Sequence, residues 1–266
     1  MQLKVYKSLW GMSGGTANFA RIASAGFDGI ESAVAEISDN DRFRSMLAEF
    51  GLGYIPLIYT EGNSPAEHLA DFERLVSEAS KFVASKIIAH FGRDLWSFDD
   101  QLRFFEKALR IEEQFGIPIA HETHRRRPLF SPMNTVNILK RLPTLKITAD
   151  LSHWCCVTES MLEDHEEAIA LVAKNAIHIH SRVGYENSPQ VSDPRLPQWA
   201  GHVAKFEGWW KQIIAEATLR GDDVMSITPE YGPPSYQQTD PITGKPVADH
   251  WEICLWAKER IRKFEV

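Results

Sequence analysis

Four segments of the sequence carry side chains of the types that bind metal ions and transfer protons. These side chains are Glu122 in His121-Glu122-Thr123-His124, Asp150 in Asp150-Leu151-Ser152-His153, His180 in His178-Ile179-His180, and Glu230 in Pro229-Glu230-Tyr231-Gly232. Three carboxylates and one imidazole are an oxygen-rich set, which suits Mn, Mg, Co or Zn better than a metal that prefers thiolates. If the fold brings the four side chains together, they form a site for one divalent metal ion.

The four side chains belong to segments with the alternation of β-strands. Side chains of a strand point to opposite faces in turn, so Thr148 and Asp150 share one face and Ile147 lies on the other. The apolar faces of the strands are expected to pack against covering helices, so the ligand-type residues point to the inside of the barrel, at its mouth. A divalent cation there would offset the cost of grouping carboxylates. His178 and His180 have equal parity. His180 is nearer to the loop and is the predicted ligand, whereas His178 is expected to contact substrate or to lie behind the ligands.

Short β-like runs alternate with amphipathic helical patterns from one end of the chain to the other, which predicts repeated βα units around a parallel sheet. Helix starts are marked by Ser64-Pro65-Ala66-Glu67, by Ser97 and by Ser131-Pro132. Eight such units favour one closed (β/α)8 TIM barrel over residues 1–266 rather than an open doubly wound sheet. The predicted strands lie near residues 3–9, 29–32, 54–59, 86–90, 118–123, 146–151, 176–181 and 224–230.

Three polar or glycine-rich segments are predicted to be loops. Gly11-Met12-Ser13-Gly14-Gly15 lacks the GxGxxG spacing of a dinucleotide site and has no P-loop lysine, so we expect it to be the first βα loop. Residues 184–202 and 232–250 follow the last two strands, where barrel enzymes keep their substrate loops.

The composition argues against several classes of partner. Lys and Arg total 29 against 36 for Asp and Glu, a formal charge of −7, so no general attraction to nucleic acid or anionic lipid is expected. No apolar run approaches the roughly 18 residues of a membrane span, and the first residues lack the layout of a secretory signal. The 3 cysteines form no CxxC pair, which argues against disulfides and zinc knuckles. These features predict a soluble, cytoplasmic protein that binds neither nucleic acid nor membrane.

The chain resembles the xylose isomerase-like superfamily of TIM barrels, which includes AP endonuclease family 2, and is similar to its sugar isomerase and epimerase type. The superfamily also contains related dehydratases and endonuclease IV-type nucleases. The resemblance rests on five segments that span nearly the whole chain in the expected order. They are Ala-Gly-Phe-Asp-Gly-Ile-Glu at 25–31, His-Glu-Thr-His at 121–124, Asp-Leu-Ser-His at 150–153, Ile-His-Ser-Arg at 179–182 and Thr-Pro-Glu-Tyr-Gly at 228–232.

The resemblance implies a cofactor, an activity and a set of roles. One divalent metal ion would be bound by Glu122, Asp150, His180 and Glu230, and His153 would contact the substrate. Glu122 and Glu230 would also be the catalytic pair that moves a proton through an enediolate. Return of the proton to the neighbouring carbon gives an isomerase, and return to the opposite face of the same carbon gives an epimerase. The implied substrate is a carbohydrate, and relatives that form dimers or tetramers imply a homo-oligomer.

Further side chains near the strand ends are candidates for binding a sugar or its acid derivative. Arg182 is the first candidate for clamping an oxygen or a carboxylate, and Arg195 is the second, with solvated loop arginines as the alternative. His90, Glu31 and Trp10 end early strands and are expected to line the pocket. The Trp10 ring would support the C–H face of a sugar or serve in ordinary packing.

The run Arg125-Arg126-Arg127 follows the strand that carries Glu122. We favour a loop cluster that balances the nearby acids, with a phosphate site as the alternative, so a phosphorylated substrate stays open.

Three other functions are compatible with the predicted fold. A metal-dependent dehydratase of a keto-sugar, keto-inositol or dehydroshikimate-like substrate begins with the same proton abstraction. An endonuclease IV-like nuclease uses three zinc ions and needs more ligands than the sequence offers, because neither Tyr59-Thr60 nor Asp193-Pro194-Arg195 supplies a histidine. A non-catalytic sugar-binding protein would not need the complete series of Glu, Asp, His and Glu.

Overall fold

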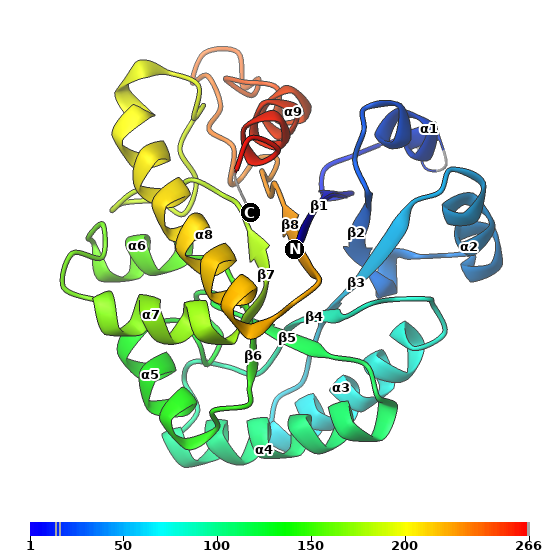
Figure 1. Ribbon diagram of the computed structural model, residues 1–266, viewed down its shortest axis with the longest axis vertical. Helices are drawn as coiled ribbons and strands as arrows, with labels where there is room; N and C mark the ends of the chain where they lie inside the picture. Colours follow the sequence, from blue (N-terminus) through cyan, green and yellow to red (C-terminus); the bar gives the residue numbers. More distant parts are fainter. Residues whose placement is uncertain (14, 16, 265–266) are drawn as a thin grey trace.

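The chain folds as a closed barrel of eight parallel strands in sequence order, surrounded by helices (Figure 1). The computed structural model describes residues 1–13, 15 and 17–264, so Gly14 of the predicted first loop lies outside the described residues. The (β/α)8 prediction is confirmed, and each predicted strand begins and ends within about two residues of an observed one. The strands are β1 (Gln2–Ser8), β2 (Gly29–Ala33), β3 (Gly53–Tyr59), β4 (Ile87–His90), β5 (Ile119–Glu122), β6 (Lys146–Ala149), β7 (Ala176–His180) and β8 (Val224–Thr228).

Several of the helices that follow the strands begin at a capping side chain. The hydroxyl of Ser64 accepts a hydrogen bond from the amide of Glu67, and Ser97 and Ser131 cap their helices in the same way. The helical segments are α1 (Ala17–Ser24), η1 (Val34–Glu36), α2 (Asn40–Glu49), α3 (Pro65–Ala79), α4 (Phe98–Phe115), α5 (Pro132–Arg141), α6 (Ser152–Thr158), α7 (Glu166–Asn175), η2 (Pro197–Trp199), α8 (Ala200–Arg220) and α9 (His250–Ile261). No helix in the described ranges is both long and apolar enough to cross a bilayer.

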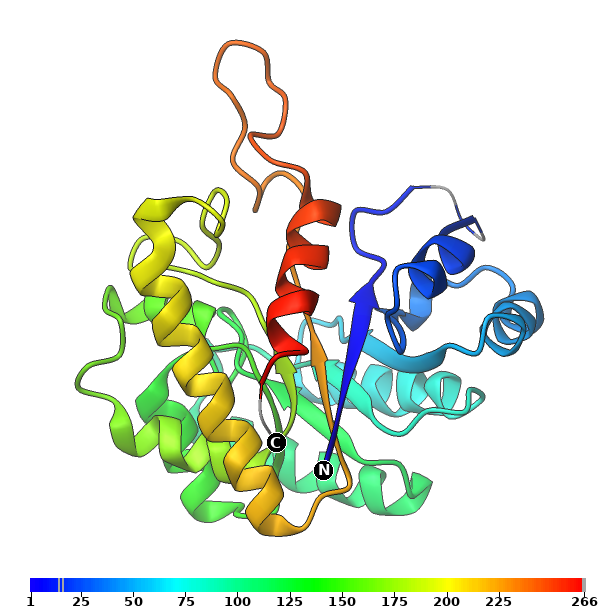
Figure 2. The ribbon, with the colours of Figure 1, turned by 45° about the horizontal axis from the view of Figure 1, so that its top comes forward.

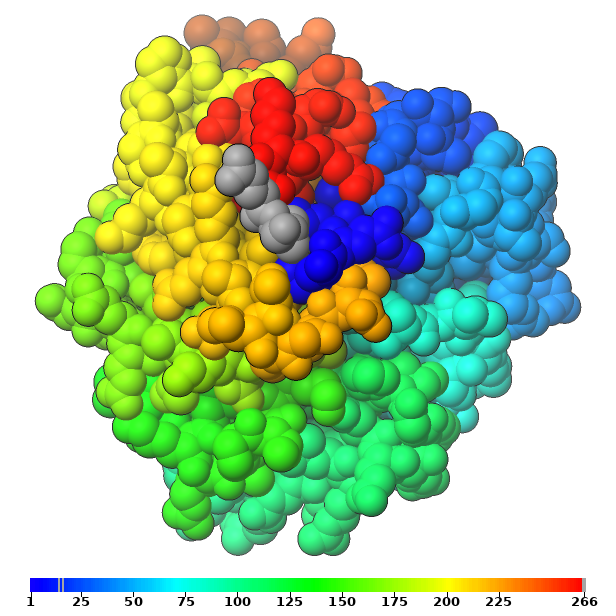
Figure 3. Space-filling model, in the orientation of Figure 1, coloured from blue at the N-terminus to red at the C-terminus, as the bar shows by residue number. Residues whose placement is uncertain are grey.

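The first strand closes the barrel against the last. β1 pairs with β8 in parallel register, and the amide of Gln2 donates to the carbonyl of Asp223 at 2.8 Å. Arg262, just after α9, donates to the carbonyl of Leu3 at 2.9 Å. On the face drawn in Figure 3 the first residues accordingly lie between α9 and the segment that joins α8 to β8. At the other end, the connection from β8 to α9 rises above the barrel (Figure 2), as expected for a substrate loop.

The inside of the barrel is divided between an apolar and a polar region. Tyr6, Ile55, Leu57 and Ile88 form a separate apolar cluster contributed by β1, β3 and β4. Towards the carboxyl ends of β6, β7 and β8, the inward positions carry polar side chains that are almost fully buried, namely Thr148, His178, His180, Ser226 and Thr228. Buried polar groups need partners, so the polar half of the interior is where a functional site has to be built.

Gly29 marks a close approach of three neighbouring strands. A Cβ at this position would lie 2.4 Å from the carbonyl oxygen of Gly53 and 2.4 Å from Cε1 of Tyr6. The backbone of β3 cannot withdraw without breaking its pairing with β2, so the sheet admits no side chain here.

We expect Gly29→Ala to lower the free energy of unfolding by about 1–3 kcal/mol or more, because the added methyl group overpacks the barrel. Gly208→Ala is the matched control, since its added Cβ meets nothing within 4 Å on α8. The control should gain about 0.5–1 kcal/mol, since alanine replaces a helical glycine. Urea unfolding followed by circular dichroism measures both, and equal stabilities would contradict the packing described here.

His121 shows the opposite parity to Glu122 and faces the helical layer. Its ring lies 4.5 Å from that of Phe91 and 5.3 Å from that of Phe105, measured between centroids. Neither ring nitrogen has a hydrogen-bond partner in the described part of the chain. Burial lowers the pKa of His121 from 6.5 to about 3, so the imidazole is neutral in the folded protein.

Acid should therefore destabilise the protein partly through His121. As the pH falls from 6.5 towards 3, the unfolded chain takes up a proton on this side chain that the folded chain does not. His121→Leu removes this proton uptake, so the free energy of unfolding of the variant relative to the wild type should increase by about 1.4 kcal/mol for each pH unit by which the pH falls across this window. Chemical denaturation at a series of pH values tests this, and a difference that stays constant with pH would refute it.

Candidate metal centre

The four predicted metal ligands meet at the carboxyl end of the barrel. Glu122 and His180 are the last residues of β5 and β7, Asp150 directly follows β6, and Glu230 lies two residues beyond β8. One ligand atom from each side chain lies within 4.8 Å of those of the other three. All four residues are buried, with Glu230 the most exposed at 5%. The structure thus brings together the whole predicted set, and metal binding by it stays a prediction.

The donor atoms of this group fit a divalent cation. Nδ1 of His180 lies 3.3 Å from Oε2 of Glu122 and 3.4 Å from Oε2 of Glu230. Oε2 of Glu122 also contacts Nε2 of His90, and Oε2 of Glu230 lies 3.2 Å from Nη2 of Arg182. In the described residues, none of these three buried atoms, nor Oε1 of Glu122, has a partner in hydrogen-bonding geometry. Leaving buried polar atoms unpaired is costly, and a cation between them would satisfy all four at once. Oxygen predominates among the donors, which suits hard or borderline metals.

Glu31, the central residue of β2, fixes the orientation of His180. Its Oε1 lies 3.2 Å from Nε2 of His180, and Thr228 donates to its Oε2 at 2.7 Å. A carboxylate that accepts the Nε2 proton leaves the Nδ1 lone pair free to bind a metal. Burial opposes ionisation of Glu31, but the neighbouring His180 and His178 outweigh it and lower the pKa of the carboxyl. The sequence marked Glu31 as a pocket residue and did not reveal this supporting role.

His178 lies in the layer beneath the candidate ligands. Its Nδ1 is 2.7 Å from Oγ of Ser226, and its Nε2 is 3.2 Å from Oε2 of Glu31. Lys86 donates in turn to Oγ of Ser226 at 2.9 Å. Burial lowers the pKa of His178 to about 4, so the ring is neutral. Of the two roles that the sequence left open, this geometry supports a residue behind the ligands, and contact of His178 with a substrate finds no support in it.

Arg182 supplies positive charge next to two of the candidate ligands. Its side chain is 1% exposed, and Nη2 donates to Oδ2 of Asp150 and lies 3.2 Å from Oε2 of Glu230. Nε donates to Oγ of Ser152 at 3.1 Å, and the amide of Ser152 donates to Oδ1 of Asp150 at 3.0 Å. The guanidinium predicted to clamp a substrate is therefore engaged by the carboxylates of the protein itself.

A row of rings forms one wall of the barrel mouth. The centroid of His90 lies 4.6 Å from that of Tyr59 and 4.7 Å from that of His124, and His124 lies 3.8 Å from His153. Burial lowers the pKa values of His124 and His153, so both rings are neutral. The predicted substrate residues His90 and His153 belong to this wall, whereas His124 was not singled out although it lies in the motif of Glu122.

Trp10 and Tyr236 continue this wall across the mouth. Their ring centroids are 5.0 Å apart in an edge-to-face contact, and Tyr236 also lies beneath the guanidinium of Arg182 at 4.9 Å. A Cβ at Gly232 would lie 2.2 Å from the Trp10 ring, so this glycine allows Trp10 to pack flat on the backbone. Tyr236 was missed because it lies inside a long loop, where no periodicity indicates which side chain turns inwards.

Arg195 lies apart from the group of ligands. Its Nε and Nη2 each donate to the carboxylate of Asp193 at 2.8 Å, and its side chain is 36% exposed. Contact between Arg195 and a substrate stays a prediction.

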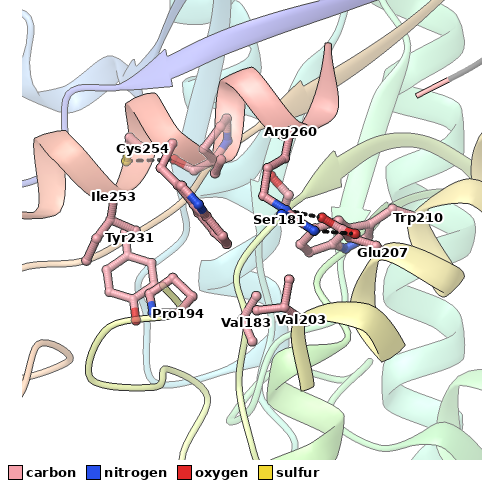
Figure 4. A pocket seen from close by; sticks show the side chains of 13 residues that line it. Ser181, Val183, Pro194, Val203, Glu207, Trp210, Tyr231, Ile253, Cys254 and Arg260 are labelled. Carbon is pink, nitrogen blue, oxygen red and sulfur yellow. Dashed lines mark hydrogen bonds and ion pairs between the residues drawn. The ribbon is translucent and has the colours of Figure 1, made fainter. Parts of the chain in front are cut away.

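A small hollow, drawn in Figure 4, lies between α8 and α9 and not in the barrel mouth. Its lining includes Val203, Trp210 and Ile253, and the ion pair between Arg260 and Glu207 lies at its edge. A volume of about 10 Å³ admits at most one water molecule, so this hollow is a packing defect.

Comparisons with known proteins agree with the barrel. A family model described as xylose isomerase-like TIM barrel matches residues 19–240. No curated protein matches the sequence. Among solved structures, the apo form of 3-keto-D-glucoside 4-epimerase from E. coli has a TM-score of 0.63 and 13% identity, covering 99% of this chain and 100% of that one. A probable 3-DHS dehydratase involved in petrobactin synthesis from Bacillus anthracis has a TM-score of 0.64 and 16% identity, covering 99% of this chain and 100% of that one.

A third structure was solved with magnesium. It is a xylose isomerase-like TIM barrel protein from Mycobacterium smegmatis, with a TM-score of 0.64 and 17% identity over 97% of this chain and 95% of that one. Identities this low show a shared fold and leave the activity to be argued from the site.

The charge of Arg182 gives a testable asymmetry between metal-free and metal-loaded protein. In the presence of a chelator, Arg182→Met should lower the free energy of unfolding by about 3–5 kcal/mol, because it leaves buried carboxylates uncompensated. Added Mn²⁺ should recover part of this loss. Arg195→Met, which breaks an exposed ion pair, is the control and should cost no more than about 1 kcal/mol. Equal losses in the two variants, measured by denaturant unfolding, would show that Arg182 does not carry this role.

Proposed function

Because the chain belongs to the xylose isomerase-like TIM barrel family, we propose that it is a metal-dependent isomerase or epimerase of a sugar or a sugar derivative. The observation that carries the proposal is the convergence of Glu122, Asp150, His180 and Glu230, whose donor atoms lie within 4.8 Å of one another at the barrel mouth. Active sites of TIM barrels lie at this end. A wall of imidazole and aromatic rings beside the group suits the flat C–H faces of a sugar.

A divalent metal bound by these four residues would polarise a carbonyl and a hydroxyl oxygen of the sugar and so acidify the C–H bond between them. Glu122 and Glu230 approach from different strands, with Nδ1 of His180 within 3.4 Å of each. A proton taken by one carboxylate can therefore be returned by either of them. Return to the adjacent carbon isomerises the sugar through an enediolate, and return to the other face of the same carbon epimerises it.

The carboxyl groups of Glu122 and Glu230 lie in different electrostatic environments. Burial opposes ionisation of Glu122, but His90 and His180 outweigh it and hold its pKa well below the ordinary value. Burial raises the pKa of Glu230 to about 7 despite its contact with Arg182. In the metal-free protein near neutral pH, Glu122 is thus ionised, whereas Glu230 is about half protonated. A divalent cation bound by both carboxylates would favour the ionised form of Glu230, so that each can accept a proton from carbon.

Dehydration of a keto-sugar, keto-inositol or dehydroshikimate-like substrate is the second candidate. The carboxylate that has taken the proton from carbon could pass it to a departing hydroxyl as readily as back to carbon, so the same pair of residues serves both reactions. The nuclease alternative has less support, because the carboxylate of Asp193 is already bound by Arg195 and Tyr59 offers no imidazole.

Glu122→Gln and Glu230→Gln should each lower kcat by about 10²–10⁴-fold while the far-ultraviolet circular dichroism stays unchanged, because each removes a proton-transfer group. Glu259→Gln, which alters an exposed carboxylate on α9, is the control and should leave turnover unchanged. After elemental analysis of the bound metal, a panel of ketoses and keto-polyols in deuterated water is followed by NMR.

Deuterium at one carbon of a product that retains every other atom of the substrate indicates isomerisation or epimerisation, whereas loss of water indicates the dehydratase. Turnover near the wild-type level in both glutamine variants would refute the assignment of Glu122 and Glu230.

A further inference from the structure

A basic cavity opens beside the candidate metal centre. It has a volume of about 390 Å³ and is formed by the segments that follow β3, β4 and β5. Four of its lining residues are arginines, against one carboxylate, Glu61. The lining consists of Thr60, Glu61, Gly62, His68, Arg93, His124, Arg125, Arg126 and Arg127. The basic run after β5 therefore does not stand alone, because the loop after β4 adds a fourth arginine to it.

The positive charge of this cavity is not balanced by the protein. Across residues 1–13, 15 and 17–264, none of Arg93, Arg125, Arg126 and Arg127 forms an ion pair with a carboxylate within 4.0 Å. Burial and the neighbouring Arg93 lower the pKa of Arg127, which reflects the crowding of like charges. An anion held between the guanidinium groups would relieve this repulsion.

The arginine-bearing loops are held in place by backbone contacts. Arg127 donates from Nη1 to the carbonyl of Gly92 at 3.1 Å, and the amide of Gly92 donates to Oγ1 of Thr60 at 3.3 Å. Gly92 has a φ of +71°, and a Cβ there would lie 3.0 Å from Pro128 and from Trp96. On the other side, Arg125 lies 5.0 Å above the ring of Tyr236. These contacts hold the loops after β3, β4 and β5 in fixed positions, so the loops would not have to become ordered when an anion binds.

His124 connects the cavity with the metal centre. It lines the cavity, and one of its ring nitrogens lies within 4.8 Å of donor atoms of His90 and Glu122. A ligand whose reacting carbons lie at Glu122 would therefore reach the arginines with its far end.

We propose that this cavity binds the phosphoryl group of the substrate, so that the protein acts on a phosphorylated sugar. The proposal rests on the proposed function for the position of the reacting carbons, but the cavity itself can be tested without turnover. Guanidinium groups from two loops suit a tetrahedral dianion with several acceptor oxygens, because each can donate to a different oxygen.

The experiment measures binding of inorganic phosphate to the metal-free full-length protein by isothermal titration calorimetry, in low-salt buffer that contains a chelator. Without metal, phosphate cannot bind at the ligands of the barrel mouth through a cation. We expect saturable binding by the wild type that weakens as salt is added. Arg93→Gln and the exposed Arg126→Gln should each weaken it by about tenfold. Arg103→Gln, at an exposed arginine that pairs with Asp100, is the control and should bind as the wild type does.

Circular dichroism verifies the fold of each variant, and Arg126, being exposed, can be replaced without disturbing packing. Absence of saturable phosphate binding, or equal binding by the wild type and both cavity variants, would overturn the proposal. If acetate bound as tightly as phosphate, the cavity would be a site for a carboxylate and not for a phosphoryl group, and this result would also overturn the proposal. Activity losses in the Glu122 and Glu230 variants do not enter this result, so the failure of one proposal is distinguishable from the failure of the other.

Discussion

The arrangement of the barrel mouth follows from the cost of burying three carboxylates close together. Each carboxylate removed from water loses several kcal/mol of solvation, and neighbouring negative charges repel one another. His180 and Arg182 supply the compensating groups within the protein, and they come from β7 and the residues just after it. A divalent cation would complete the compensation, since in the described residues Oε1 of Glu122 has no hydrogen-bond partner and its Oε2 contacts the imidazoles of His90 and His180 without hydrogen-bond geometry. The positions of Ser152, Glu31 and Thr228 are understandable as supports for these charges.

The division of the barrel interior explains where this machinery is placed. β1, β3 and β4 contribute Tyr6, Ile55, Leu57 and Ile88 to an apolar cluster, in which the hydroxyl of Tyr6 is the one polar side-chain atom. The polar inward positions belong mainly to β2, β5, β6, β7 and β8. At the rim, β3 and β4 end in the neighbouring rings of Tyr59 and His90, and Nε2 of His90 contacts Oε2 of Glu122.

The fold and the composition of the site were predictable from the sequence because both depend on local rules. Alternating apolar residues defined eight strands, and their parity identified the inward faces that carry Glu122 and Asp150. Parity does not distinguish His178 from His180, because both point inwards. Their difference is one of depth, since His178 pairs with Ser226 and His180 with Thr228 one layer higher.

Two other features of the site depended on contacts that are distant in sequence. Arg182 follows a strand and has the appearance of a solvated loop residue, yet its side chain is 1% exposed because the carboxylates draw it inwards. Arg93 lies more than thirty residues before Arg127, and only the adjacency of β4 and β5 brings their loops to one cavity. Spacing along the chain does not predict such contacts, since they depend on the order in which the strands pair around the barrel.

A continuous series of polar contacts runs from the amino end of β4 to the candidate ligands. It leads from Lys86 through Ser226, His178 and Glu31 to His180, with successive separations of 2.9, 2.7, 3.2 and 3.2 Å. The floor of this barrel is consequently not an inert scaffold. Because each member of the series holds the next, Lys86 at the base belongs to the same polar network as the imidazole at the mouth.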